Sequence, residues 1–146
     1  MTHVLDSGGL SALAAKRALI AELINREQFS PEIPSVALVE CLTGDHRQDH
    51  ATNRVLALCM VREVDAPLAR RAARLRGGTG RAGEISAADA VVVALAETVA
   101  DAVILTSDPM DLSDLATQSE HRIRIVHTGS GRQDRRVQRH SPCASL

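Results

Sequence analysis

Short runs of apolar residues alternate along the chain with longer segments in which apolar residues recur every three to four positions. Short apolar runs are typical of buried strands, and the longer spacing is typical of amphipathic helices. Strands are expected at Val4–Leu5, around Ile33, and at 62–65, 102–105 and 123–126. Because strands and helices alternate throughout, the pattern predicts an α/β fold, an open parallel sheet of about five strands with helices on both faces.

Capping residues and helix breakers set the expected helix boundaries. The Ser86 hydroxyl can accept from free backbone N–H groups of the helix that follows it, and Pro109 suits the first position of another helix. Ser35 and Gly44 bracket a third helix, and Asp45 starts a fourth. The other expected elements are two helices within residues 10–26 that meet near residue 15, a helix at 67–76, a turn at 7–9 and a loop at 77–83.

The end of the periodic region divides the chain into a domain and a tail. The 146 residues suit a single domain, which is large enough to fold around its own core without a disulfide or a metal. From His127 onward the sequence is polar and rich in Gly, Ser and Arg, without apolar periodicity. We therefore expect a domain over residues 1–128 and a flexible, arginine-rich polar tail over residues 129–146.

Composition narrows the classes of function. The net charge is −1, and Lys16 is the only lysine among 17 basic residues. Arginine binds phosphate in a bidentate way, although a general bias toward Arg and Ala explains the composition equally well. Phe29 is the only aromatic residue, so a protein that stacks bases on aromatic side chains is not expected.

Cysteine usage and hydropathy indicate the compartment. Cys41, Cys59 and Cys143 form no CxxC pair and no even framework, which is typical of a reduced, intracellular protein. No apolar run approaches the length of a membrane span, and no signal-peptide pattern follows Met1. We therefore expect a cytoplasmic protein without a membrane partner.

Four acidic residues lie where the expected strands end or on the helices beside them: Asp6, Glu40, Asp89 and Asp108. Taken singly, each has a structural explanation of at least equal weight, because Asp6 and Asp108 can cap helices and Asp89 suits the positive end of a helix macrodipole. In a parallel sheet, however, ligands bind in the crevice outside the carboxyl ends of the strands. Four carboxylates in one crevice repel one another, and oxygen ligands of this kind favour Mg²⁺ or Mn²⁺ over zinc.

Other motifs in the chain are weak. Residues 78–83 fit the dinucleotide pattern GxGxxG, but that motif needs a strand before it, whereas a basic helix is expected here. His46 and His50 are one helical turn apart, as in zinc hydrolases, but the acid between them is Asp49 and no third ligand is evident. No GK[ST] phosphate loop is present, so hydrolysis of a nucleoside triphosphate is not supported.

The four acids stand in the motifs Val-Leu-Asp6-Ser-Gly-Gly-Leu, Val-Ala-Leu-Val-Glu40, Ile-Ser-Ala-Ala-Asp89-Ala and Ile-Leu-Thr-Ser-Asp108. Together, over residues 2–127, these motifs resemble the PIN domain, and most of all bacterial VapC-type toxins. The resemblance implies a five-stranded parallel sheet with the first strand in the centre, and a metal-dependent ribonuclease. It also implies that the four acids are the metal-binding and catalytic residues, that Ser7 and Thr106 support them, and that Asp111, or Asp114 in its place, is an additional acid.

The resulting hypothesis is hydrolysis of RNA phosphodiester bonds by the toxin of a toxin–antitoxin pair, with one or two Mg²⁺ or Mn²⁺ ions among the acids. The expected partners are RNA, a small antitoxin protein and a second copy of the chain in a homodimer. Two alternatives stay open, a PIN-like binding module without catalysis and a metal-dependent phosphatase that acts on a small molecule. Candidate contacts for RNA phosphates, for which a solvated helix face is an equally good explanation, are Arg70, Arg71, Arg74, Arg76 and Arg81.

Overall fold

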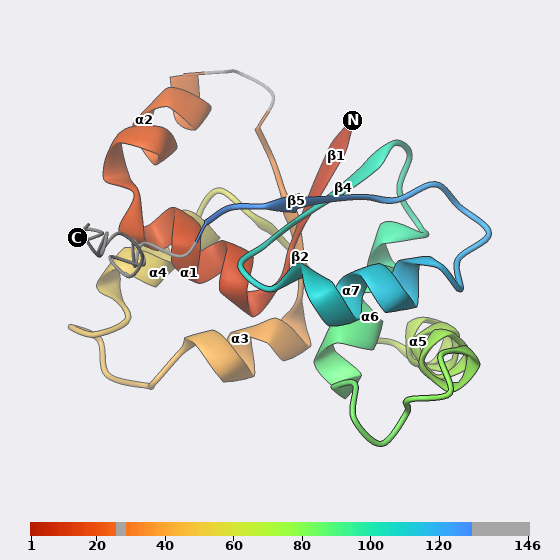
Figure 1. Ribbon diagram of the computed structural model, residues 1–146. Helices are drawn as coiled ribbons and strands as arrows, with labels where there is room; N and C mark the ends of the chain where they lie inside the picture. The colour runs from red at the N-terminus through yellow and green to blue at the C-terminus, as the bar shows by residue number, and fades with distance from the viewer. Residues whose placement is uncertain (26–28, 130–146) are drawn as a thin grey trace, which may run out of the picture.

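One parallel sheet organises the residues that the structure, a computed structural model, describes, which are residues 1–25 and 29–129. In this part of the chain the strands pair in the order β3-β2-β1-β4-β5 (Figure 1). All pairs are parallel and the first strand is central, so the α/β prediction and the topology that the resemblance implies are confirmed. The strands are β1 (Thr2–Leu5), β2 (Glu32–Pro34), β3 (Met60–Arg62), β4 (Ala102–Thr106) and β5 (Arg124–His127).

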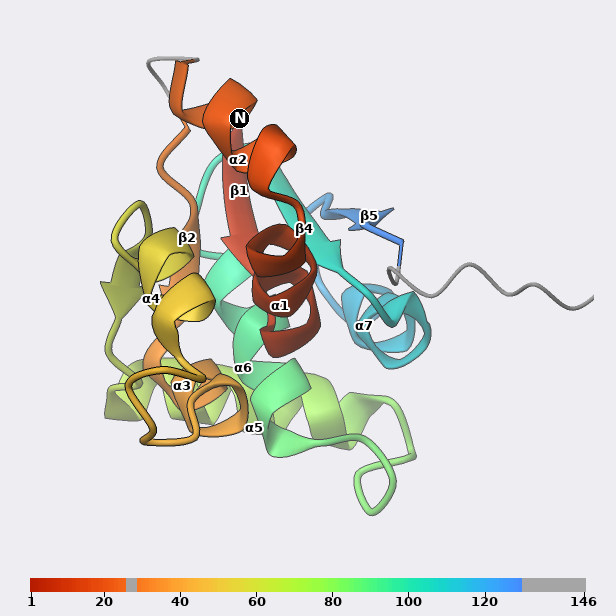
Figure 2. The same ribbon diagram turned by 90° about the vertical axis from the view of Figure 1, so that its left-hand side faces the viewer.

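Helices cover both faces of this sheet (Figure 1, Figure 2). The first and fourth helices share one buried cluster with the sheet, and the fifth, sixth and seventh share another on the opposite face. The two helices expected between residues 10 and 26 are confirmed, and they meet at Lys16. The helices are α1 (Ser7–Ala15), α2 (Arg17–Asn25), α3 (Ser35–Cys41), α4 (His50–Leu56), α5 (Ala66–Gly78), α6 (Ala87–Ala96) and α7 (Pro109–Ala116).

Neighbouring residues of the two central strands supply the two cores. Val4 of β1 and Ile104 of β4 are fully buried in the cluster beneath α6. The next residue of each strand, Leu5 or Leu105, packs in the cluster beneath α1 and α4. Successive side chains of a strand point to opposite faces, so a strand that is covered on both faces is apolar throughout. This double burial is why these short runs could be recognised as strands.

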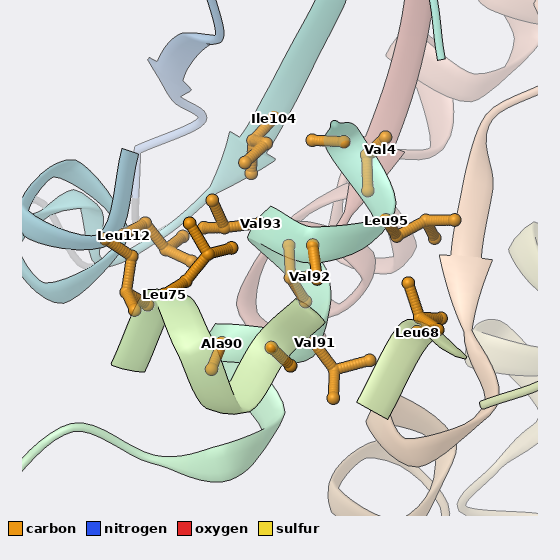
Figure 3. Close-up of a cluster of buried hydrophobic side chains, with 14 of the residues drawn as sticks. Val4, Leu68, Leu75, Ala90, Val91, Val92, Val93, Leu95, Ile104 and Leu112 are labelled. Carbon is orange, nitrogen blue, oxygen red and sulfur yellow. The ribbon is translucent and has the colours of Figure 1, made fainter. Parts of the chain in front are cut away.

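The helix α6 is almost entirely enclosed. Every residue from Ala90 to Ala96 is buried, between the sheet on one side and α5 on the other (Figure 3). Ser86 caps the helix as predicted, because its hydroxyl accepts from the backbone N–H of Asp89 at 3.0 Å. A helix that is apolar on all sides can be stable only where its neighbours cover it. The buried turns therefore fix the place of the first turn, which carries the half-buried Asp89.

Several predicted boundaries are wrong. Residues 7–9 form the first turn of α1 rather than a separate turn. The helix α3 ends at Cys41 instead of Gly44, and its N-cap is Pro34, so Ser35 is the first helical residue and caps nothing. The third strand covers residues 60–62 rather than 62–65, because Asp65 caps α5 by accepting from the backbone N–H of Leu68 at 2.9 Å.

The helix that Asp45 is expected to start begins instead at His50. Asp45 closes a turn of its own, in which its carboxylate accepts from the backbone N–H groups of Arg47 at 2.8 Å and Gln48 at 3.1 Å. A side chain that bonds to nearby backbone offers the chain an alternative to a helix. Local polar bonds have therefore displaced the helix start by five residues.

Two further expectations concern the tail and the membrane. The expected tail, residues 129–146, lies outside the described residues except for Gly129, so the domain boundary stays a prediction. Among the helices of residues 1–25 and 29–129, none has the length and apolar character needed to cross a membrane.

Candidate functional site

Carboxylates from four elements line a single pocket of about 270 Å³ beside the carboxyl ends of β1 and β4. The structure therefore brings together all four acids that the sequence singles out, and it adds Asp111 while leaving Asp114 outside. Thr106 does not line the pocket but bonds to one of its acids. The lining residues are Asp6, Ser7, Gly8, Glu40, Ser86, Asp89, Ser107, Asp108 and Asp111.

Asp6 is the most enclosed of these acids, with only 6% of its surface exposed. It directly follows β1 and caps α1, since one carboxylate oxygen accepts from the backbone N–H of Gly9 at 2.5 Å. The other oxygen accepts from the Thr106 hydroxyl, also at 2.5 Å. Burial raises the pKa of Asp6 and the Asp89 carboxylate adds to the rise, while the hydrogen bonds from Thr106 and Gly9 oppose it. Capping and membership of the pocket are thus two roles of one side chain.

Thr106 connects Asp6 to a second acid of the pocket. Its hydroxyl is fully buried, donates to Asp6 and accepts from the backbone N–H of Asp108 at 3.0 Å. Asp108 caps α7, although its bond from the backbone N–H of Met110 is long at 3.4 Å. One buried hydroxyl therefore contacts both the Asp6 carboxylate and the backbone of Asp108.

Asp89 and Glu40 complete the four. Asp89 is half-buried in the first turn of α6, and Glu40 is exposed near the end of α3. Burial raises the pKa of Asp89, and the carboxylates of Glu40, Asp111 and Asp108 raise it further. The neighbouring carboxylates thus disfavour the charged form of Asp89.

Ser7 and Cys41 join α1 to α3 behind Glu40. The Cys41 thiol donates to the backbone carbonyl of Ser7 at 3.6 Å. Burial, with the nearby carboxylates of Glu40 and Asp6, raises the pKa of the Cys41 thiol to about 11. Cys41 therefore joins α3 to α1 as a hydrogen-bonded packing residue.

The donors fit a hard divalent cation in their chemistry. All titratable groups that line the pocket are carboxylates, which are the ligands that Mg²⁺ and Mn²⁺ prefer. In the described part of the chain, no three Asp, Glu, His or Cys side chains are already arranged to hold a metal ion. Both oxygens of Asp6 already accept hydrogen bonds, from the Gly9 N–H and from the Thr106 hydroxyl.

The five arginines predicted to contact RNA do not line this pocket. The Arg71 guanidinium lies 3.5 Å from Glu97, and Arg76 donates to the backbone carbonyl of Ile85 at 2.7 Å. Arg81 pairs with Glu84, Asp111 and Asp114. Among the residues described, Arg70 and Arg74 are exposed and form no hydrogen bond or ion pair.

Sequence reasoning missed three lining residues, Gly8, Ser86 and Ser107. The sequence indicates Ser86 only as a helix cap and places Gly8 in a turn, and Ser107 stands between the candidate residues Thr106 and Asp108. These residues could have been found from their neighbours in the sequence. A residue in the same turn as a pocket acid lies, like that acid, at the edge of the sheet.

Comparisons with known proteins agree with the architecture. A family model described as PIN domain matches residues 4–117. A DNA-bound VapBC from Salmonella typhimurium superimposes with a TM-score of 0.66 at 18% identity, covering 88% of this chain and 98% of that one. VapBC2 from Rickettsia felis, bound to a DNA fragment from its promoter, gives a TM-score of 0.65 at 13% identity. This match covers 87% of this chain and 98% of that one.

A third structure, FitAB bound to an IR36 DNA fragment, gives a TM-score of 0.61 at 15% identity and covers 91% of this chain and 99% of that one. No curated protein matches the chain. At identities this low, the three solved structures show a shared fold, while the family model rests on the sequence itself.

Proposed function

Because the chain belongs to the PIN domain family, we propose that its acidic pocket hydrolyses RNA phosphodiester bonds as a metal-dependent endoribonuclease. The observation that carries the proposal is the convergence of Asp6, Glu40, Asp89 and Asp108 on one pocket from separate elements. Helix capping alone explains Asp6 and Asp108, but it gives no reason for Glu40 to lie with them. A shared cation gives that reason, and it disfavours a binding module that has lost catalysis.

Asp6, Asp89 and Asp108 are the proposed direct ligands of one or two Mg²⁺ or Mn²⁺ ions. Glu40, which is exposed, acts through a water molecule or orients the attacking water. When bound, the ion would supply a water of lowered pKa and offset the negative charge of the phosphate.

The protein's own contribution is to place these ligands. The Thr106 hydroxyl holds the Asp6 carboxylate and the Asp108 backbone at the same time. The Ser86 hydroxyl fixes the first turn of α6 and so the position of Asp89. Ligands that are held by other groups need less ordering when substrate arrives, which favours the transition state.

RNA phosphates are proposed to bind along α5. Arg70 and Arg74 are exposed on this helix without a partner among the described residues, so both guanidinium groups are available. Arg71, Arg76 and Arg81 already pair with groups of the protein and are weaker candidates. Phosphate contacts position RNA without reading its sequence, so they suit a site whose specificity lies elsewhere.

We also propose that the protein is a toxin held by a small antitoxin. Val39 is 80% exposed and Met110 is 70% exposed, and each precedes an acid of the pocket, Glu40 or Asp111. Apolar side chains next to an acidic pocket suit an amphipathic partner helix that carries an arginine. The similar solved structures are the VapBC and FitAB complexes, which adds weight to a partner of this kind.

The nuclease proposal is tested by incubating the purified protein, without partner, with total cellular RNA in Mg²⁺, in Mn²⁺ and in chelator, and mapping new ends. We expect internal cleavage that needs the metal. Release of mononucleotides or phosphate from short substrates only would favour the phosphatase alternative. Absence of any cleavage, with intact metal binding, would favour the binding module.

Assembly is tested separately. High-level expression of the chain alone should be toxic, and light scattering should give the mass of a homodimer. Harmless expression together with full nuclease activity in the same cells would contradict the toxin assignment.

A further inference from the structure

Arg81 lies in the loop between α5 and α6, and its backbone is held in place. Its N–H donates to the Thr79 hydroxyl at 3.1 Å. Its carbonyl accepts from the N–H groups of Glu84 at 2.9 Å and Ile85 at 3.0 Å. Arg81 therefore extends its side chain from a closed turn rather than from a free loop.

The Arg81 guanidinium bridges this loop to α7. Nε donates to Glu84 at 2.9 Å, Nη1 donates to Asp114, and Nη2 donates to Asp111 at 3.3 Å. Asp111 and Asp114 are three residues apart, so they share one face of α7. Only Asp111 also lines the acidic pocket. One guanidinium thus bonds to three carboxylates, and its longest bond is to Asp111, the carboxylate that borders the pocket.

We infer that Arg81 is a positioning residue that holds Asp111 at the rim of the pocket and offsets part of its charge there, so that Arg81 sets the affinity of the pocket for a divalent cation. The inference rests on the proposed function, because it takes the pocket to be an ion site. It reassigns Arg81 from RNA binding to control of an acid.

Electrostatic coupling across the pocket supports this role. Asp111 and Asp89 line the same pocket, so a charge on Asp111 acts on an ion that binds there. A carboxylate that shares its charge with a guanidinium attracts a cation less strongly than a free one. Glu84 and Asp114 anchor Arg81 independently of Asp111, so Asp111 can turn to an ion without releasing the arginine.

The test is calorimetric titration of the full chain with Mn²⁺. Arg81→Gln should bind Mn²⁺ about threefold to tenfold more tightly than wild type, the effect expected for removing one screened positive charge near a divalent ion. In the Asp111→Asn background the same substitution should change affinity less than about twofold. Arg81→Lys, which keeps the positive charge, should keep the affinity within about twofold of wild type.

Matched controls remove charges at the other end of the sheet. Arg122→Gln deletes a positive charge near the amino end of β5 and should leave Mn²⁺ affinity unchanged. Asp114→Asn gives a second test that does not alter Arg81. It leaves the guanidinium to Asp111 and Glu84, so Mn²⁺ should bind about twofold to fivefold more weakly. Asp101→Asn, a carboxylate lost beside Arg122, should have no such effect.

Several results would overturn the inference. One is a Mn²⁺ affinity that Arg81→Gln leaves unchanged, and another is an affinity change that persists in the Asp111→Asn background. A third is an Asp114→Asn variant whose Mn²⁺ affinity equals that of Asp101→Asn. If wild type bound Mn²⁺ but did not cleave RNA, the proposed function would fail. The Mn²⁺ affinities of these variants would still test the role of Arg81. If wild type cleaved RNA and the Arg81 variants bound Mn²⁺ like wild type, only the inference would fail.

Discussion

Two aspartates are almost equally buried, yet their surroundings act on their charge in opposite directions. Asp49, 5% exposed, lies before α4 and accepts from the Thr43 N–H, the Thr43 hydroxyl and the Gly44 N–H, each at 2.9 Å. These bonds, led by that from the Thr43 N–H, hold the pKa of Asp49 below its ordinary value. Asp6, 6% exposed, has two donors and a second carboxylate nearby, and burial raises its pKa.

The difference shows that burial alone does not identify a functional acid. At Asp49 the donors of one turn satisfy the carboxylate, so the region is complete without a ligand. At Asp6 the donors do not offset burial and the charge of Asp89, so the charged form of the carboxyl is disfavoured there. An acid whose surroundings leave its charge uncompensated is a candidate for a cation site.

The largest expected effect comes from Asp6→Asn, which removes the charge but keeps the shape. RNA cleavage should fall by orders of magnitude because a proposed metal ligand is lost. In chelator the variant should melt at or above the wild-type temperature, since Asn also caps helices and repulsion is relieved. The stabilisation that Mn²⁺ gives should largely disappear.

The measurement is a pair of melting curves for each protein, in chelator and in Mn²⁺, beside one cleavage assay. If Asp6 were only a helix cap, mutant and wild type would show equal Mn²⁺-induced shifts and equal activity.

Thr106→Val should have the next largest effect on activity. The substitution is close to isosteric at a fully buried site, and it removes the hydroxyl that supports Asp6 and Asp108. Loss of a group that orients metal ligands typically lowers metal affinity or activity by about 10- to 100-fold. Cleavage rates for Val and Ser variants measure this, because Thr106→Ser keeps the hydroxyl and should retain most activity. Equal losses in both variants would point to packing instead.

Asp49→Asn should lower stability without touching the pocket. Because its pKa is lowered on folding, the Asp49 carboxylate stabilises the fold at any pH above 3.8, its ordinary pKa. This contribution is lost as the pH falls through the lower pKa of the folded state. The variant should therefore melt below wild type at pH 7, and the gap should close toward pH 3. Melting curves across this range test the sign, while Mn²⁺-induced shifts should match wild type. A gap that widened in acid would contradict the assignment.

Removal of the tail should have the smallest effect. The sequence after Gly129 is nearly devoid of apolar residues, so we expect a chain ending at Gly129 to keep its unfolding free energy within about 0.5 kcal/mol. Denaturant unfolding of both lengths measures this. A loss above about 2 kcal/mol would mean that the tail packs on the domain.

The parts of the fold that the sequence could predict are those set by apolar burial. Val4–Leu5 and residues 102–105 are strands covered on both faces, and Ser86 caps a helix that is buried along its length. The start of α4 could not be predicted, because Asp45 and Asp49 bond to neighbouring backbone in competition with the helix. That competition depends on a few hydrogen bonds rather than on periodicity.

The candidate site divides in the same way. Asp6 and Asp108 follow parallel strands, so their meeting at one sheet edge could be expected from topology. The pairing of Arg81 with Asp111 and Asp114 could not, because it joins residues 30 and 33 positions apart through the path of a loop. Long-range contacts made by exposed side chains leave no periodic trace in a sequence.

The close packing of α1 against β4 has a consequence for how the sequence can vary. A Cβ atom added at Gly9 would stand 2.0 Å from the backbone carbonyl oxygen of Leu105, whereas one at Gly8 would meet mainly the movable Ser107 hydroxyl. A mutagenesis library selected only for folding would therefore tolerate Asn or Gln in place of the pocket acids, but it would reject alanine at Gly9. In such a library the least tolerant position near the pocket would be an uncharged one.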